Sequence, residues 1–459
     1  MDNKTDARQD PGSFRRLFLA PEQALVVSFL LLSFAGAFLL YLPFSAGQGR
    51  LSFIDALFTS TSAVCVTGLS VLDISRALSM PGQTVLLGLV QLGGLGILTF
   101  SSLFILLLNR RVSVSNQLLI QSSLNQFETS SLRGILLSVG LYTFIIELAG
   151  SLFLFQFFRQ EIPDPGRRLF SAVFHSVCAF CNAGFSNFSD NLFRYSADWG
   201  VNLTVMFLIV TGGIGFFVLF ELSKNFLQLF RKAGEKPLTL TLHTRTVLQA
   251  TFFLIVGGAV LIGLTDIAAR GWSRDRLLPY LFLSVTSRTA GFNTLNMALL
   301  PAGTAIIVIL LMFIGGASGS TAGGVKVTTA AVVYQFIVTR LRIRRDVELN
   351  NRRLPFEIVN RSLMVVFFSL ALIIAVVLVL SLVQPNFPGK TLAFIFETVS
   401  AFGTVGLSLG VTPELTTAGK IAIIMTMFVG RVGPLTLVMA LSRAEKFDYR
   451  FPEEKINIG

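Results

Sequence analysis

The amino-acid sequence predicts an all-α membrane protein made of four copies of one unit, in which a short re-entrant helix lies between two membrane spans. Three observations lead to this prediction. Apolar residue types make up 53% of the 459 residues and charged types 14%, and the mean hydropathy is +0.72, as in integral membrane proteins. Long and short apolar runs alternate along the chain. One glycine pattern recurs four times.

Eight apolar runs are long enough to cross a bilayer as helices. They cover residues 24–42, 82–108, 132–158, 200–222, 245–264, 303–339, 357–383 and 418–441. A shorter apolar run lies between the two members of each successive pair. A run of this length favours a helix that enters the membrane and returns. The four short runs cover residues 53–69, 169–185, 276–292 and 391–407.

Lys and Arg are concentrated in the two tails and in the loops that join one pair of spans to the next, including RLRIRR at 340–345. Cytoplasmic loops carry such an excess, so we expect both termini in the cytoplasm and the short runs to open to the outside. Some positive charge falls on the outer side, at Arg167, Arg168, Arg274 and Arg276. The first 23 residues lack an apolar core with a cleavage site, and we expect no removable signal peptide.

Alignment of the short runs on one glycine shows that they are related. The four sequences are FTSTSAVCVTGLS with Gly68, FHSVCAFCNAGFS with Gly184, LFLSVTSRTAGFN with Gly291 and FETVSAFGTVGLS with Gly406. A second pattern lies in the later span of each pair: GGLGILT at 93, GGIGFFV at 212, GGASGST at 315 and GRVGPLT at 430. Each unit crosses the membrane twice, so the copies share one orientation around an axis along the membrane normal. The predicted repeats are residues 1–115, 116–230, 231–345 and 346–459.

The aligned glycines indicate a site for a cation. A short helix that ends near the glycine directs the negative end of its dipole towards the common axis. The residues that follow can direct main-chain carbonyl oxygens inward in place of water, and glycine permits the φ values that this requires. Side chains vary around the glycine, so we expect backbone ligands. The candidate segments, called the filter segments below, are Val66, Thr67, Gly68; Asn182, Ala183, Gly184; Thr289, Ala290, Gly291; and Thr404, Val405, Gly406. The alternative is that each glycine serves only helix packing or a turn.

The span at 303–339 is too long for one membrane helix. It would measure about 55 Å against a hydrocarbon core of about 30 Å. The small residues of GGASGSTAGGVK at 315–326 predict where it breaks. Such backbone must line water or be buried in protein, so it either blocks a path or forms a closely packed kink. Arg431 lies in the last span, where a bare charge costs about 2.5 to 3.5 kcal/mol, and must meet water, an acid or carbonyls.

These motifs resemble those of the Trk/Ktr/HKT superfamily of potassium transporters, most closely its bacterial KtrB-type subunits, over roughly residues 20–459. The resemblance implies a potassium-channel-like fold: four covalently linked span–pore helix–span repeats around a pseudo-four-fold central pore, with no enzymatic activity. Gly68, where sodium-preferring plant-type members have Ser, favours potassium, and a sodium-preferring transporter of the same fold is the alternative. The resemblance also implies an intramembrane gate formed by Gly315, Gly316, Ser318, Gly319, Ser320, Gly323 and Gly324, with Arg431 beside it. An ion pair of Arg431 with Glu397 or Glu147 is the alternative.

The resemblance implies partners as well. They are a second copy of the chain, met partly through the C-terminal RFPEEKINIG, and a cytosolic RCK-type nucleotide-binding regulatory subunit that forms a KtrA-like ring. The expected location is the bacterial plasma (inner) membrane. We expect no cofactor in this chain, potassium as the substrate, and sodium as a candidate coupling or activating ion. The basic loops also suit contact with anionic membrane lipid, and they lack the pattern of a nucleic-acid-binding surface.

Other polar residues are weaker signals. His175, Cys178 and Cys181 invite a metal interpretation, but the first and last lie about 9 Å apart on one helix, too far to share an ion. We expect packing there and no transition-metal site. Only two histidines occur, which disfavours a membrane enzyme, and the four-fold repeat disfavours a structural or assembly protein. Asp55 and Glu397 could cap a short helix or tune its field.

Overall fold

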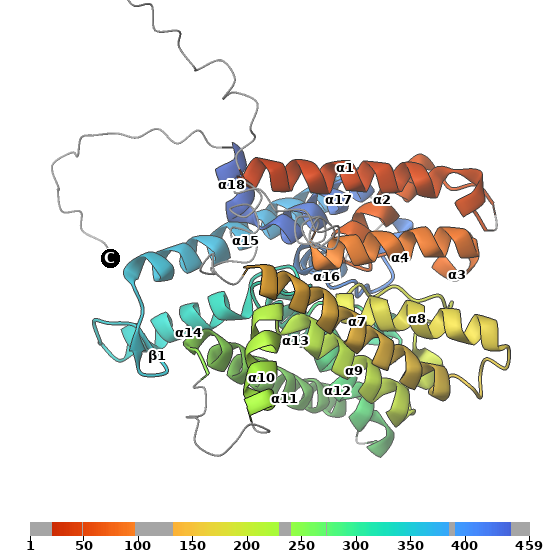
Figure 1. Cartoon of the computed structure of the whole chain (residues 1–459). Helices are drawn as coiled ribbons and strands as arrows, with labels where there is room; N and C mark the ends of the chain where they lie inside the picture. Colours follow the sequence, from red (N-terminus) through yellow and green to blue (C-terminus); the bar gives the residue numbers. More distant parts are fainter. Residues whose placement is uncertain are drawn as a thin grey trace, which may run out of the picture.

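The computed structural model describes residues 21–47, 49–96, 132–228, 240–271, 273–384 and 391–441. These residues form mostly helices, with one hairpin in which β1 (Glu348–Leu349) pairs antiparallel with β2 (Arg352–Arg353). The long helices lie alongside one another with roughly aligned axes (Figure 1). This helical architecture confirms the predicted fold class.

The first helix of each repeat is long and apolar. These helices are α1 (Pro21–Tyr41), α7 (Leu132–Phe157), α11 (Leu242–Arg270) and α15 (Phe356–Val383). By length and composition they are the four described helices that can each cross a membrane, and a bent pair, described below, adds a fifth candidate span. Each exposes large apolar side chains, for example Phe144 and Phe253, as a lipid-facing helix requires.

The short helices coincide with the predicted short runs and are largely buried. They are α2 (Phe53–Val64), α8 (Pro165–Cys181), α12 (Leu277–Thr286) and α16 (Thr391–Gly403). In three repeats, a serine of the short helix donates a hydrogen bond of 2.7 Å to a backbone carbonyl of the first helix. The residue with that carbonyl is followed three positions later by a glycine, whose missing side chain leaves room for the serine. The pairs are Ser60 with Ser33, Ser176 with Glu147 and Ser284 with Ile255, beside Gly36, Gly150 and Gly258.

The second helix of each repeat ends at its glycine motif. These helices are α4 (Met80–Leu95), α9 (Trp199–Gly213), α13 (Ala302–Phe313) and α17 (Thr417–Val432), and three continue after a break as α10 (Phe216–Gln228), α14 (Val327–Leu341) and α18 (Pro434–Leu441). The sequence predicts a break only before α14, and the structure shows that the spans predicted at 200–222 and 418–441 are broken as well. Gly215 and Gly433 have φ of 93° and 94°, which ends a right-handed helix, and α9 meets α10 at 104°. Residues 97–108 of the predicted second span lie outside the described residues.

The repeats pack in a closed cycle. The second helix of each repeat contacts the short helix of the next: α4 with α8, α9 with α12, α13 with α16, and α17 with α2. The last contact includes an ion pair in which Lys420 Nζ lies 2.6 Å from Asp55 Oδ1. Asp55 also lies in the first turn of α2, where Ser52 accepts its backbone N–H. Because the fourth repeat returns to the first, the chain surrounds a central axis.

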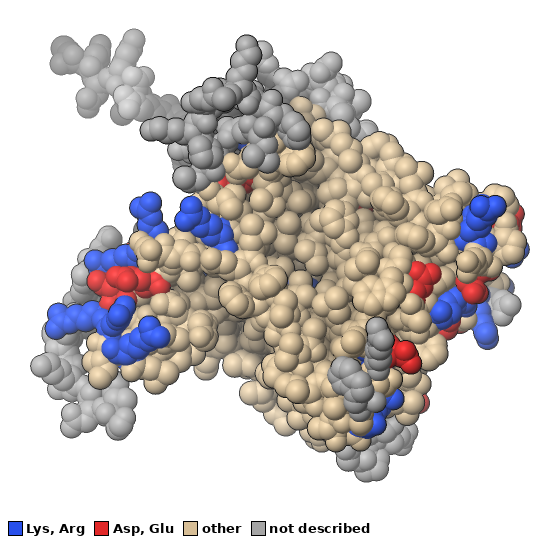
Figure 2. All heavy atoms as spheres, turned by 90° about the horizontal axis from the view of Figure 1, so that it is seen from below, with Lys and Arg blue, Asp and Glu red and all other residues tan. Residues whose placement is uncertain are grey.

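On the face seen in Figure 2, charged side chains gather towards the two ends of the molecule, and few charged side chains lie between them. The end that carries α14, β1 and β2 exposes Arg340, Arg342, Arg344, Arg345, Arg352 and Arg353. The opposite end carries α3 (Ile74–Ala77). Short 3-10 turns occur at Pro43–Ser45, Phe193–Tyr195, Arg274–Arg276, Met297–Leu299 and Thr412–Glu414. The N-terminal tail, the first joining loop and the C-terminal RFPEEKINIG lie outside the described residues, so the orientation and the repeat boundaries stay predictions.

Candidate functional site

A residue with positive φ follows the end of each short helix and lies two positions before the aligned glycine. The φ angles are 58° at Val66, 60° at Asn182, 109° at Thr289 and 50° at Thr404. In three repeats the next N–H returns to a carbonyl five residues earlier, at 2.7 Å for Thr67 and Ala183 and 2.8 Å for Val405. This is a Schellman helix end, which usually has Gly or Asn at the left-handed position. It directs the chain out of the helix and into the filter segment.

The four aligned glycines form a closed ring. Their φ angles are 85°, 62°, 81° and 95° in chain order. A Cβ added to each would lie 2.2 to 2.5 Å from the carbonyl oxygen that precedes the next glycine, so only glycine fits. Gly68 meets Ala183 O, Gly184 meets Ala290 O, Gly291 meets Val405 O, and Gly406 meets Thr67 O. The structure therefore brings all four filter segments together around one centre, as the alignment predicts, while their role in ion binding stays a prediction.

Backbone conformation alternates along each filter segment. The glycine and the residue two positions before it have positive φ, and the residue between them does not. Alternation of this kind turns successive peptide planes the same way, which glycine permits without strain. Apart from the half-buried Gly68 and Gly406, the filter residues are buried. The segments are thus enclosed stretches of oriented backbone.

A non-helical loop joins α13 to α14 beneath this ring, and residues 315–326 are called the gate loop below. Its two ends are paired, because Gly315 N–H donates to Val325 O at 2.8 Å and Val327 N–H donates to Gly316 O at 3.0 Å. Within the loop, Ser320 Oγ donates to Ala317 O at 2.7 Å. The loop is therefore a defined structure closed at its base.

The gate loop touches the inner ends of three filter segments. Gly323 N–H donates to Thr404 Oγ1 at 3.1 Å, and Asn182 Nδ2 donates to Thr321 Oγ1 at 2.8 Å. A Cβ on Gly315 would lie 3.4 Å from the Thr289 methyl group. Each contact falls on the left-handed residue at the end of a short helix. The loop therefore lies directly against the ring.

The breaks in the second helices hold the gate loop in place. Ala317 N–H donates to Gly213 O at 2.9 Å, Phe216 N–H to Gly319 O at 3.1 Å, and Gly324 N–H to Gly430 O at 3.1 Å. A broken helix frees backbone groups that must find partners when buried. Here the gate loop supplies those partners. The remaining predicted gate residues, Gly316 and Ser318, lie against Ala322 and near Thr328.

Arg431 connects three repeats through backbone carbonyls. Its guanidinium donates to Thr321 O in the gate loop and to Gly93 O and Gly94 O at the end of α4. No ion pair joins it to an acid in the described part of the chain. Glu147 instead accepts from Gln91 Nε2 at 3.2 Å and Glu397 accepts from Thr412 Oγ1, so neither acid of the alternative pairs with Arg431 in this structure.

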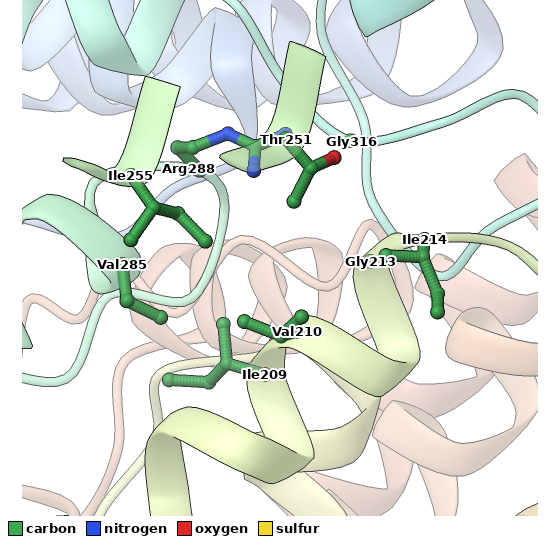
Figure 3. Close-up of a pocket in the computed structure, with 9 residues that line it drawn as sticks. All are labelled: Ile209, Val210, Gly213, Ile214, Thr251, Ile255, Val285, Arg288 and Gly316. Atoms are coloured by element: carbon green, nitrogen blue, oxygen red, sulfur yellow. The ribbon is translucent and has the colours of Figure 1, made fainter. Parts of the chain in front are cut away.

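Two further cations lie at the gate loop. Lys326 Nζ donates to Ala322 O at 2.7 Å, so this side chain turns back to the loop. Arg288, which the sequence reasoning does not single out, donates from Nη2 to Gly315 O at 3.3 Å and is 8% exposed. It reaches into a small cavity with apolar walls, including Ile209 and Ile255 (Figure 3). The signal for Arg288 was available, since a charge in a short apolar run is costly.

His175 and the cysteines near it are occupied in local packing. His175 Nδ1 lies 2.8 Å from Ser171 O and Nε2 lies 2.9 Å from Ser186 Oγ, while Cys181 Sγ lies 3.4 Å from Gln91 Oε1. Among the described residues, no three His, Cys, Asp or Glu side chains are grouped so that they could hold a metal ion.

Comparison with known proteins agrees with the predicted resemblance. The family model of the TrkH cation transport proteins matches residues 8–448. The chain is 39% identical to Ktr system potassium uptake protein B of Bacillus subtilis over 446 residues, 96% of this chain and 97% of that protein. It is 35% identical to potassium/sodium uptake protein NtpJ of Enterococcus hirae over 453 residues, 96% of this chain and 98% of that protein.

A solved structure has the same fold. The crystal structure of the potassium transporter TrkH from Vibrio parahaemolyticus matches 93% of this chain and 86% of its own length, with a TM-score of 0.72 and 19% identity. The predicted KtrB-type resemblance is confirmed by the sequence relatives, and the four-repeat architecture agrees with this fold. The chain therefore belongs to the TrkH family of cation transport proteins, whose members are transporters and not enzymes.

Proposed function

We propose that this chain is the pore-forming subunit of a potassium uptake system in the plasma membrane, and that potassium crosses through the ring of filter segments. The closed ring of glycines is the observation that carries this proposal. Carbonyl oxygens of four segments around one centre can replace the water shell of a monovalent cation. The carboxyl ends of the four short helices add partial negative charge there. The relatives named as potassium uptake proteins favour this ion.

The gate loop is the proposed barrier on the inner side of the ring. Its hydrogen bonds to Asn182 and Thr404 support this role, since they place the loop against the filter segments. Arg431 holds the closed loop through Thr321 O and adds a positive charge that repels cations. Ions pass when the loop leaves the ring.

The proposed control comes from outside the chain. A cytosolic RCK-type nucleotide-binding ring would dock on the basic end at 340–353, which is continuous with α14 and thus with the gate loop. The phrase "Ktr system" in the names of the relatives favours an assembly of several components. We further propose a homodimer with both termini in the cytoplasm, anionic lipid at the basic end, and no cofactor within this chain.

Uptake of rubidium and sodium by liposomes that contain the purified protein tests this function. We expect rubidium uptake that a matching regulatory ring stimulates, and growth of a potassium-uptake-deficient host at low external potassium. Liposomes with the Gly291→Ser variant provide the matched comparison for the filter. Absence of cation uptake by a folded, monodisperse protein with its regulatory ring would contradict the proposal.

A sodium-preferring transporter of the same fold is the second candidate. The Enterococcus hirae relative is named for both potassium and sodium uptake, and sodium is also our candidate coupling or activating ion. The ratio of rubidium to sodium uptake in the same liposomes separates the two candidates. A ratio of rubidium to sodium uptake below one would identify the chain as a sodium-preferring transporter.

A further inference from the structure

Two positions flank every filter segment at the same distance in all four repeats. The first lies nine residues before the aligned glycine, on the short helix, and is occupied by Thr59, His175, Phe282 and Glu397. The second lies two residues after the glycine and is occupied by Ser70, Ser186, Asn293 and Ser408. In the second and fourth repeats, the first position carries a buried ionisable side chain that is hydrogen-bonded to the segment leaving the filter.

In the second repeat this link is direct. His175 is fully buried, and its Nδ1–H donates to Ser171 O at 2.8 Å, because a carbonyl only accepts. In the neutral ring, Nε2 then accepts from Ser186 Oγ at 2.9 Å. Phe188 stacks on the imidazole with 4.5 Å between ring centroids. The imidazole thus connects the short helix to the chain just beyond Gly184.

In the fourth repeat the link passes through one hydroxyl. Glu397 is fully buried, and Thr412 Oγ1 donates to its Oε1. The same hydroxyl lies 2.9 Å from Ser408 Oγ, two residues beyond Gly406. The second carboxyl oxygen, Oε2, has no hydrogen-bond partner among the described residues. A buried carboxyl is costly, so a purely apolar side chain would pack here at lower cost.

The other two repeats lack this link. Thr59 Oγ1 has no hydrogen-bond partner in the described part of the chain, and Phe282 has no polar atom in its side chain. The third segment is fixed differently, because Thr286 Oγ1 donates to Phe292 O at 2.7 Å. Since the ring order is one, two, three, four, the repeats with His175 and Glu397 lie opposite each other.

We propose that His175 and Glu397 are positioning residues that fix two opposite filter segments at the spacing that suits potassium and disfavours the smaller sodium ion. This inference rests on the proposed function of the ring. Carbonyl ligands discriminate between cations only when their spacing and number are maintained. Side chains that support a binding site from behind commonly provide this restraint. Neither residue contacts the ion, and both act through the backbone beyond the glycine.

The test is the ratio of rubidium to sodium uptake by liposomes that contain His175→Phe, Glu397→Leu or Thr412→Val. Phenylalanine is the residue that the third repeat has at this position. We expect each variant to retain rubidium uptake and to lose about tenfold in the ratio, as for the loss of one hydrogen bond. Glu397→Gln should retain most of the ratio, because its amide oxygen still accepts from Thr412. Thr59→Val, which removes an unpartnered hydroxyl at the matching position, should leave it unchanged.

The other outcomes separate this inference from the function on which it rests. An unchanged ratio in folded His175→Phe and Thr412→Val, when Gly291→Ser lowers it, overturns the inference and leaves the filter assignment intact. An equal loss of rubidium uptake and sodium uptake indicates a purely structural role and also overturns the inference. If Gly291→Ser leaves the ratio unchanged, the proposed function itself is wrong. Thr412→Val keeps Glu397 in place, so it provides the test of the fourth repeat if Glu397→Leu does not fold.

Discussion

Val66, Thr289 and Thr404 adopt a left-handed backbone conformation that β-branched residues rarely take. Glycine would relieve this strain at the end of a helix. At Thr404 the side chain explains the exception, because its hydroxyl accepts the Gly323 N–H of the gate loop. Strain of about 1 to 3 kcal/mol is typical of residues held at functional sites. The same residue therefore ends a helix and contacts the loop beneath it.

Substitution of a ring glycine should weaken ion discrimination. In Gly68→Ser, the new Cβ would collide with Ala183 O, so one quarter of the ring must move. We expect the ratio of rubidium to sodium uptake to fall about tenfold or more, since discrimination depends on the spacing and number of the carbonyl ligands. Gly88→Ser is the matched control, because a Cβ there meets no atom within 4 Å. Equal ratios in the two variants would contradict the filter assignment.

Neutralisation of Arg431 should open the path. Arg431→Gln loses charged hydrogen bonds to Thr321 O and to the end of α4, each worth about 1.5 to 3 kcal/mol. We expect rubidium uptake without the regulatory ring to increase about tenfold, with the ratio to sodium unchanged. Arg194→Gln is the control, because Arg194 pairs with Asp190 on an exposed loop. No change in uptake by Arg431→Gln would show that Arg431 does not hold the gate.

Among single residues, the sequence identifies the ring of aligned glycines well and the residues around the ring poorly. The four glycines are visible because the repeat is nearly periodic and a Cβ is excluded at each. The left-handed residues are not visible in this way, because their roles depend on which backbone atoms lie beside them from other repeats. Among the four filter segments, only the second has at its left-handed position a residue type that signals this conformation, Asn182.

The broken second helices are the elements that sequence reasoning describes least completely. Only the third span is long enough to force a break, so only its break is predicted. In the others, Gly96, Gly215 and Gly433 end the helix through positive φ. Glycines are also common in membrane helices because they allow close packing. Composition alone does not distinguish a glycine that ends a helix from one that allows packing.

The gate loop should loosen when its bonds to other elements are removed. Thr321 Oγ1 binds Asn182 Nδ2 and the carbonyls of Phe180 and Gly212. Thr321→Val keeps the shape but loses these bonds, so we expect rubidium uptake without the regulatory ring to increase several-fold. Faster hydrogen exchange in the loop should accompany it.

Ser320→Ala is the control for this prediction, because among the described residues Ser320 bonds only to Ala317 O and to Ala322 N–H inside the loop. We expect it to change uptake much less than Thr321→Val. If both variants behave alike, internal stiffness of the loop matters more than its attachment to neighbouring helices.

Contact between the first and last repeats closes the cycle of repeats. Lys420 and Asp55 form the ion pair between them, with side chains 16% and 17% exposed. Lys420→Met leaves Asp55 unpaired, and we expect a loss of about 1 to 3 kcal/mol in stability, between the values for exposed and buried pairs. Thermal unfolding in detergent measures this loss. The exchanged pair Asp55→Lys with Lys420→Asp should recover part of it, and no recovery would contradict a direct pairing.

The circular order of the repeats could be predicted in outline, since four equivalent units on one axis must follow one another around it. The sequence could not predict which helix of one repeat contacts which helix of the next. These contacts depend on side-chain shape, and all the helix faces concerned are apolar. The pairing of α17 with α2 is an example.

Because all four quarters of the ring belong to one polypeptide, each can be altered alone. In a channel made of four identical subunits, one mutation changes the equivalent residue in all four quarters of the ring. Here serine can replace the aligned glycine in one, two, three or four places, in any arrangement. Variants with adjacent and with opposite pairs contain the same number of changes, so any difference in their permeation would report the geometry of the ring itself.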